Sequence, residues 1–162
     1  MILLTLVLCA VPPDSQLIRD KGNESGLIVY DVWSVATLAT GAVGIATTND
    51  PKWQGVHIAH LVWGGVNVGI ALISSIIALK DPHTPEDEAT MRKHGHEQQR
   101  LYAINAIFDV ATTMVSVAIF QGVKDDRWQG FAVGSLVQSL FLLAFDTTMS
   151  MYHFINNRRS AD

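Results

Sequence analysis

The sequence predicts an all-α fold, a four-transmembrane-helix bundle made of two tandem helical hairpins. Charged residues are only 16 % of the 162-residue chain, whereas they are about 25 % of an ordinary soluble domain. The charges gather in residues 14–24, 80–100, 124–127 and 156–162, and the stretches between them are nearly uncharged. The second half of the chain also repeats a pattern of the first. Blocks of charge between long apolar stretches are typical of membrane spans, because a soluble helix carries charge on its outer face.

Four apolar stretches qualify as spans: about 26–47, 56–79, 101–123 and 130–155. Each has the roughly 20 residues that cross about 30 Å of hydrocarbon. In lipid the backbone must satisfy its own hydrogen bonds, which favours helices. Short connections at 48–55 and 124–129 predict two antiparallel hairpins. Four core helices of a soluble protein are the alternative, disfavoured because helices that are apolar on every side cannot face water.

The connection between the hairpins, residues 80–100, is long and polar. Pro82 and Pro85 end the second span. Thr84 followed by Pro85 is typical of a helix start, with Thr84 as N-cap and Pro85 at the first helical position. We therefore expect a short surface helix in this middle loop, which could continue towards the third span.

A shift of 75 residues aligns the two halves. The segment Asp50-Pro-Lys-Trp-Gln-Gly55 falls on Asp125-Asp-Arg-Trp-Gln-Gly130, and Ser34-Val-Ala-Thr37 falls on Asp109-Val-Ala-Thr112. This predicts a duplicated helix–turn–helix unit, with repeat one at about 26–79 and repeat two at about 101–155. Both copies would cross the membrane in the same sense, about a pseudo-twofold axis along the membrane normal. Trp53 and Trp128 would then be anchors at one interface.

Small residues recur at helical spacing in the first two spans. Such residues let helix backbones approach closely in lipid. We expect two sets to pack inside the chain: Ser34, Thr37, Gly41 and Gly44 in the first span, and the GxxxG pair Gly65 and Gly69 in the second.

Residues 1–10 read as a signal peptide cleaved near Ala10 or as an uncleaved apolar tail, and residues 11–162 as a single domain. Cleavage would place both ends of the mature chain outside the cytoplasm, whereas the positive-inside rule places them inside, so orientation stays open. The lone Cys9 excludes an internal disulfide framework. The net charge of −4 disfavours a nucleic-acid partner.

The charged side chains within the spans are the first candidates for function. A carboxylate at the centre of a membrane helix costs about 2.5–3.5 kcal/mol. The spacing predicts that Asp109 and Asp146 lie at one depth, with Asn105 one turn from Asp109. We expect these three residues to converge inside the bundle with Asn67 of the second span and with Tyr30 and Asp31 of the first.

Two carboxyl groups this close are expected to share a proton, since both cannot ionise cheaply in a low dielectric. This suits a proton or cation site. The alternative is that each neutral acid hydrogen-bonds a neighbouring helix and fixes the register of the bundle.

His57 and His60 lie one helical turn apart, near Trp53 and Trp128. Paired histidines can ligate a metal or haem iron. No further strong ligand stands beside them, so ordinary interfacial histidines are favoured and no cofactor is predicted. Nucleophile elbows, phosphate-binding glycine loops and zinc-protease motifs are absent from the sequence.

The last two spans resemble an uncharacterised family of bacterial four-helix integral membrane proteins, a domain of unknown function. The resemblance rests on Asn105-Ala-Ile-Phe-Asp109, the NxxxD pair of that family's third span, and on the run from Gln138 to Phe-Leu-Leu-Ala-Phe-Asp146 in the fourth. It covers about residues 16–155, and Trp63…Asn67 and the early turn at 23–26 also match. Ser139 departs from the glycine usual there. The resemblance implies a membrane fold and a signal peptide, and no activity.

The leading interpretation is a non-enzymatic helical scaffold or accessory subunit, embedded in the inner membrane of a bacterium as a homo-oligomer or part of a larger complex. The first alternative is a small proton- or cation-coupled transporter that uses Asp109 and Asp146. The second is a membrane redox, metal- or haem-binding protein that uses His57 and His60.

Overall fold

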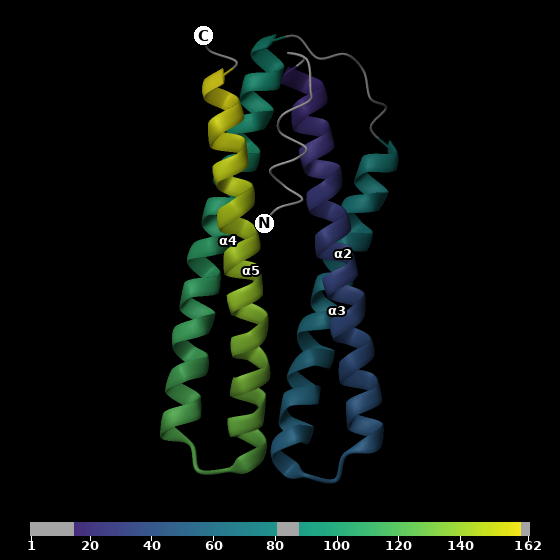
Figure 1. Ribbon diagram of the computed structural model, residues 1–162, viewed down its shortest axis with the longest axis vertical. Coiled ribbons are helices and arrows are strands. Elements are labelled where there is room, and N and C mark those ends of the chain that lie inside the picture. Colours follow the sequence, from purple (N-terminus) through teal and green to yellow (C-terminus); the bar gives the residue numbers. More distant parts are fainter. Residues whose placement is uncertain (1–14, 81–87, 160–162) are drawn as a thin grey trace, which may run out of the picture.

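Four long helices form two antiparallel hairpins in the computed structural model, which describes residues 15–80 and 88–159. The helices are α2 (Ser15–Thr47), α3 (Pro51–Lys80), α4 (Glu88–Gly122) and α5 (Asp126–Arg159). Both short turns lie at one end of the bundle, and α2 begins where α5 ends at the other (Figure 1). The described ranges contain no strand, so the all-α prediction is confirmed. The predicted signal peptide and the Thr84 cap lie outside them.

Each helix extends beyond the apolar stretch that predicted it. The 33 residues of α2 give a helix about 50 Å long, well over the roughly 30 Å of a hydrocarbon core. α4 begins at Glu88, so the polar residues from there to 100 form its first turns. A separate surface helix is therefore not found in the described part of the middle loop. This stretch stays helical because it packs on the end of α5, where Gly95 contacts the side chain of Asn157.

The two turns use the same chemistry. Asp50 accepts hydrogen bonds from the backbone nitrogens of Lys52 (2.8 Å) and Trp53 (3.1 Å) and so caps α3. Asp125 caps α5 in the same way through the nitrogen of Trp128 (3.0 Å). One glutamine in each helix then closes its turn, because Gln54 donates to the Thr48 carbonyl (3.2 Å) and Gln129 to the Val123 carbonyl (2.9 Å). Capping and turn closure account for the aspartate and glutamine shared by both segments.

The glycine that ends each shared segment lies where α3 crosses α5. A Cβ atom on Gly55 would overlap the carbonyl oxygen of Arg127, and one on Gly130 would overlap that of Lys52. One helical turn further on, a Cβ on Gly134 would lie 2.7 Å from that of Ala59. The two backbones are therefore in direct contact, which only glycine allows.

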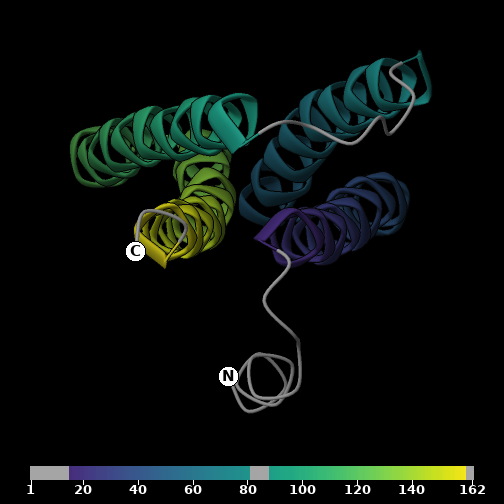
Figure 2. The same cartoon turned by 90° about the horizontal axis from the view of Figure 1, so that it is seen from above.

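α5 is the central helix. It packs along α4 and along α3 and touches α2 over a shorter stretch, while α2 packs along α3. α4 packs chiefly on α5 and lies at the edge of the bundle, as the end-on view shows (Figure 2). Side chains on α5 are therefore placed where those of the other three helices can reach them.

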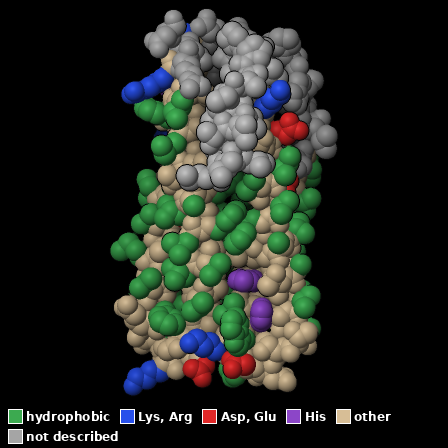
Figure 3. Space-filling model, viewed as in Figure 1, with side chains coloured by type: hydrophobic (Ala, Val, Ile, Leu, Met, Phe, Trp, Pro, Cys, Tyr) green, Lys and Arg blue, Asp and Glu red, His purple; other side chains and the backbone are tan. Residues whose placement is uncertain are grey.

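The polarity of the bundle is inverted relative to a soluble protein. Large apolar side chains face outwards, with Ile107 71 % exposed and Met114 67 % exposed. The space-filling view shows them over the middle of the bundle and charged side chains near its ends (Figure 3). Among the residues whose burial the structure describes, the buried polar or charged ones are Ser34, Thr37, Asn67, Asp109, Ser116, Ser135, Gln138, Ser139, Asp146 and His153. All four helices are long and apolar enough to cross a membrane.

The two sets of small residues that were predicted to pack inside the chain differ in their contacts. Ser34, Thr37, Gly41 and Gly44 are all buried. The GxxxG interpretation was wrong, because a Cβ on Gly65 or Gly69 would meet nothing within 4 Å. The close approach uses Gly64 instead, which lies against the backbone of Leu38. One residue turns a helix by about 100°, so the neighbouring glycine faces away from α2.

Candidate functional site

The site is a polar cluster halfway along the bundle, with members from all four helices. Asp109 of α4 and Asp146 of α5 are 4 % and 6 % exposed, and their carboxyl groups are hydrogen-bonded to each other. They meet because α4 and α5 run antiparallel and each contributes an inward-facing position at the same depth. A hydrogen bond between two carboxyl groups needs a proton on one of them. The arrangement therefore suits a pair of carboxyl groups that share a proton.

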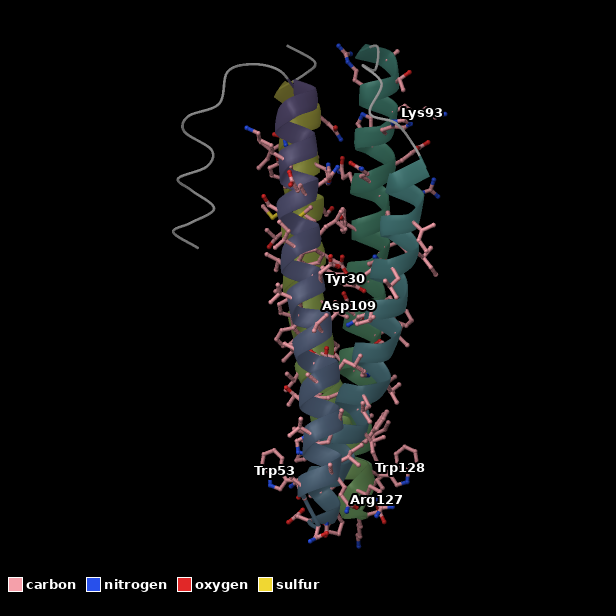
Figure 4. The ribbon with its side chains drawn as sticks, turned by 90° about the vertical axis from the view of Figure 1, so that its right-hand side faces the viewer. Tyr30, Trp53, Lys93, Asp109, Arg127 and Trp128 are labelled. Carbon is pink, nitrogen blue, oxygen red and sulfur yellow. The ribbon has the colours of Figure 1, made fainter. Side chains whose placement is uncertain are left out.

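Tyr30 links the acidic pair to the first hairpin. Its hydroxyl donates to Asn67 Oδ1 (3.2 Å), which joins α2 to α3. The same hydroxyl lies near enough to Asp146, Asp31 and Asp109 to interact with their charges. Tyr30 and Asp109 lie at the same level of the bundle (Figure 4). Tyr30 thus connects residues that are far apart in the sequence.

The other two predicted members are placed less deeply. Asn105 hydrogen-bonds Asp146, yet it is exposed. The expectation that it lies inside the bundle was therefore wrong, because α4 packs chiefly on α5 and leaves that flank open. Asp31 is half-buried, and its buried Oδ1 has no hydrogen-bond partner among the described residues.

Besides Asp31 Oδ1, two atoms of the cluster are buried and unpartnered within the described part of the chain: Asn67 Nδ2, a donor, and Asp109 Oδ2, an acceptor. Both side chains are more than nine-tenths buried. Such atoms are uncommon in native structures, since each carries a desolvation cost. The cluster can therefore make further hydrogen bonds without breaking those that it has.

A second polar network was not predicted from the sequence. It lies one to two helical turns from the acidic pair, towards the short loops that join the helices of each hairpin. Gln138 of α5 accepts from Trp33 Nε1 (2.9 Å) and donates to Thr37 Oγ1 (3.3 Å) of α2. Beside it, Thr113 of α4 donates to Ser139 of α5 (2.9 Å). The signal was available, because a glutamine within an apolar span needs partners.

Replacing Gln138 with leucine should destabilise the bundle. The change leaves the Trp33 indole and the Thr37 hydroxyl without their partner, and hydrogen bonds between membrane helices are worth about 0.6 kcal/mol on average and up to about 1.7. We expect the free energy of unfolding in detergent to fall by about 1–3 kcal/mol. Gln121→Leu is the matched control, since Gln121 is exposed. Equal effects of the two changes would contradict a structural role for the network.

A third group of polar and aromatic residues lies between the acidic pair and the end of the bundle opposite the two short turns. His153 is 1 % exposed, and its ring stacks on Tyr102 at 5.6 Å. Tyr102 also meets Phe145 edge-on at 6.2 Å and lies near Asp146. The buried polar positions of α5 thus extend from Ser135 to His153, with the acidic pair between them.

The predicted histidines and tryptophans lie towards the turns. Trp53 and Trp128 are 58 % and 56 % exposed and lie at the same end of the bundle as Arg127 (Figure 4). His57 and His60 are half-buried on α3. Within the described residues, no group of three or more His, Cys, Asp or Glu side chains gathers as a metal cage.

Fold and site together define an all-α protein with four candidate membrane spans around a buried acidic pair. The chain belongs to a family of unknown function, DUF6992, whose model matches residues 29–147. That range contains every residue of the acidic cluster described above. No curated protein and no solved structure matches the chain. The match agrees with the expectation of an uncharacterised family.

Proposed function

We propose that the chain is an integral membrane protein that binds and releases a proton at Asp109 and Asp146, as a small proton-coupled carrier. The observation that carries the proposal is the hydrogen bond between these two buried carboxyl groups. Loss of the shared proton leaves two negative charges side by side, so release is favourable only when a cation or a movement of the helices compensates. That dependence is what couples a proton to a second event.

The neighbouring contacts favour this role over a purely structural one. One to two helical turns away on the same pair of helices, Thr113 and Ser139 join α4 to α5 by a neutral hydrogen bond. Such a bond fixes the register of two helices without a charge in the membrane, whereas each carboxylate costs about 2.5–3.5 kcal/mol when it ionises there. An acidic pair is therefore an expensive choice for packing alone.

The free atoms of the cluster support the exchange of a proton or a small cation. Asn67 Nδ2 and Asp109 Oδ2 have no partner among the described residues, and they offer one donor and one acceptor beside the pair. The buried serines, glutamine and histidine of α5 extend the polar interior in both directions from Asp146. A proton that leaves the pair thus has polar neighbours on either side.

The two hairpins are best understood as duplicated units that run in parallel, and we include this in the proposal. The supporting contacts are reciprocal, because Gly55 packs against Arg127 and Gly130 packs against Lys52. Gly130 lies 75 positions after Gly55, and Arg127 lies 75 positions after Lys52. Asn23 also hydrogen-bonds Gln98, 75 positions later (3.2 Å). The acids lie in the second unit only, since Ser34 and Ala71 stand at the matching positions. The bacterial inner membrane is the expected location.

Infrared spectroscopy and proton flux test the two parts of the proposal separately. The purified protein at neutral pH should show the C=O stretch of a protonated carboxyl group, and this band should be lost in the Asp109→Asn/Asp146→Asn variant. Liposomes that contain the protein and an internal pH dye should acidify faster than empty liposomes under an inside-negative potential. A protein without the band would overturn the proton site. The band without flux, in liposomes both with and without an opposing Na⁺ or K⁺ gradient, would overturn the carrier and favour the scaffold interpretation.

A further inference from the structure

The proposed proton function does not involve a pair of histidines on α3 that lies near the short turn that joins α2 to α3. The rings of His57 and His60 lie one helical turn apart, with centroids separated by 6.4 Å and planes at 86°. Trp53, one turn earlier, has its ring 6.3 Å from that of His57. The pair is seven residues or more from Asn67, at least about 10 Å along the helix, and so is separate from the acidic cluster.

The imidazole nitrogens of this pair are poorly satisfied. His57 Nδ1, His60 Nδ1 and His60 Nε2 are buried, and none of them has a hydrogen-bond partner among the described residues. Buried nitrogens normally have a hydrogen-bond partner, and a group that lacks one calls for an explanation such as a bound water or ion. Each neutral imidazole has one nitrogen with a free electron pair, so the two adjacent side chains offer two possible ligand atoms.

The packing of α2 makes room for these rings. A Cβ on Gly44 would overlap the His57 imidazole, and one on Gly41 would lie 2.8 Å from the carbonyl oxygen of His57. Any larger residue at Gly44 would displace the ring. The histidine and the glycine opposite it therefore form a matched set, built across the α2–α3 interface.

The second hairpin shows that this arrangement is not needed for folding. The residues 75 positions after His57, His60 and Gly44 are Ala132, Ser135 and Ile119. Ala132 is 1 % exposed, so a buried small side chain stands at the position that corresponds to His57. The same type of hairpin thus packs without imidazoles. In the first hairpin, glycine on α2 leaves the space that the His57 ring on α3 occupies.

From these contacts we infer that His57 and His60 bind a late first-row transition-metal ion such as Zn²⁺ or Cu⁺. Neutral imidazole nitrogens suit these ions, whereas Mg²⁺ and Ca²⁺ take oxygen ligands. With a metal–nitrogen distance of about 2.0–2.1 Å, two imidazoles that share an ion have ring centres within about 6.5 Å of each other. The observed 6.4 Å is at this limit and so corresponds to linear two-coordinate binding, as Cu⁺ accepts. Tetrahedral Zn²⁺ requires the two ring centres to approach to about 5 Å.

Two protein ligands leave coordination positions open. No third His, Cys, Asp or Glu joins the pair within the described residues. A closed structural site needs four protein ligands, whereas an open one keeps positions for exchangeable groups. The site is thus suited to binding and release of the ion at the turn end of the bundle. This inference does not depend on the proposed proton function.

The test uses the full chain with an affinity tag that contains no histidine, in a background where His83, His94 and His96 are alanine. The protein is stripped with a chelator in detergent and titrated with Zn²⁺ and with Cu⁺ under reducing conditions. We expect one equivalent to bind. The single variants His57→Gln and His60→Gln should each weaken binding 10-fold or more, and Mg²⁺ should not bind.

X-ray absorption at the zinc edge provides a readout that needs no further variant. The background protein with one equivalent of Zn²⁺ should show two imidazole ligands. Absence of saturable binding, or binding unchanged in both glutamine variants, would overturn the inference. If the glutamine variants do not fold, a spectrum with fewer than two imidazoles has the same consequence, and a spectrum with two supports the site.

Discussion

Alanine at Gly55 or Gly130 is expected to disrupt the contact between the hairpins, whereas alanine at Gly65 or Gly69 is expected to be tolerated. At the first two positions the new methyl group would overlap a backbone carbonyl of the other helix. A backbone atom cannot rotate away as a side chain can, so α3 and α5 must separate. Overpacking of a core typically costs 1–3 kcal/mol. Because both partners here are backbone, we expect about 3 kcal/mol or more.

The two control variants, with alanine at Gly65 or Gly69, are expected to leave stability unchanged or to raise it slightly. A Cβ on Gly65 or Gly69 meets nothing within 4 Å, and alanine is favoured over glycine in a helix by up to about 1 kcal/mol. These variants should therefore be as stable as the wild type or slightly more stable. The measurement is the unfolding transition of each variant in detergent, followed by the loss of the monodisperse peak on heating. Similar losses at all four positions would contradict the α3–α5 crossing.

Asparagine at Asp109 or Asp146 is expected to abolish proton flux while leaving the bundle folded. The carboxamide keeps the shape of the side chain and can donate a hydrogen bond to the remaining carboxyl group, but it carries no exchangeable acid. Flux in liposomes should fall to the level of empty liposomes. The unfolding transition should move little, because the link between α4 and α5 is retained.

Leucine at the same positions separates the two roles. Asp109→Leu removes the hydrogen bond and leaves a buried acid without its partner, which costs about 1–3 kcal/mol. We expect this variant to lose both flux and stability. If asparagine and leucine destabilise the protein equally, the acids act in folding and not in proton binding. Flux that persists in the asparagine variants would place the proton path elsewhere.

The positions of the helices followed from hydropathy, but their ends did not. Apolar stretches locate the part of a helix that lipid would surround, and all four were found. The polar helical segments beyond these stretches, such as residues 88–100 of α4, remain helical because they pack on α5. That packing joins residues about 60 positions apart, which no local pattern reveals.

The candidate site was predictable in its chemistry more than in its geometry. Asp109 and Asp146 stand out because charge is rare in an apolar stretch, and helix length places them at one depth. The burial of Asn67 and the exposure of Asn105 depend on which helices flank α3 and α4. Tyr30 was expected near the pair, yet its bond to Asn67 depends on how α2 lies against α3.

By itself, the sequence determined the all-α class, the two hairpins and the acids that set the second hairpin apart. The tertiary structure alone decided which small residues make contacts: Gly64 packs on α2, whereas Gly65 and Gly69 face outwards. It also decided that Gln138 joins α2 to α5 and that Gly44 makes room for His57. The physical reason is that composition and period depend on each residue's own properties. A contact between helices depends on rotation about their axes, and a shift of one residue changes it completely.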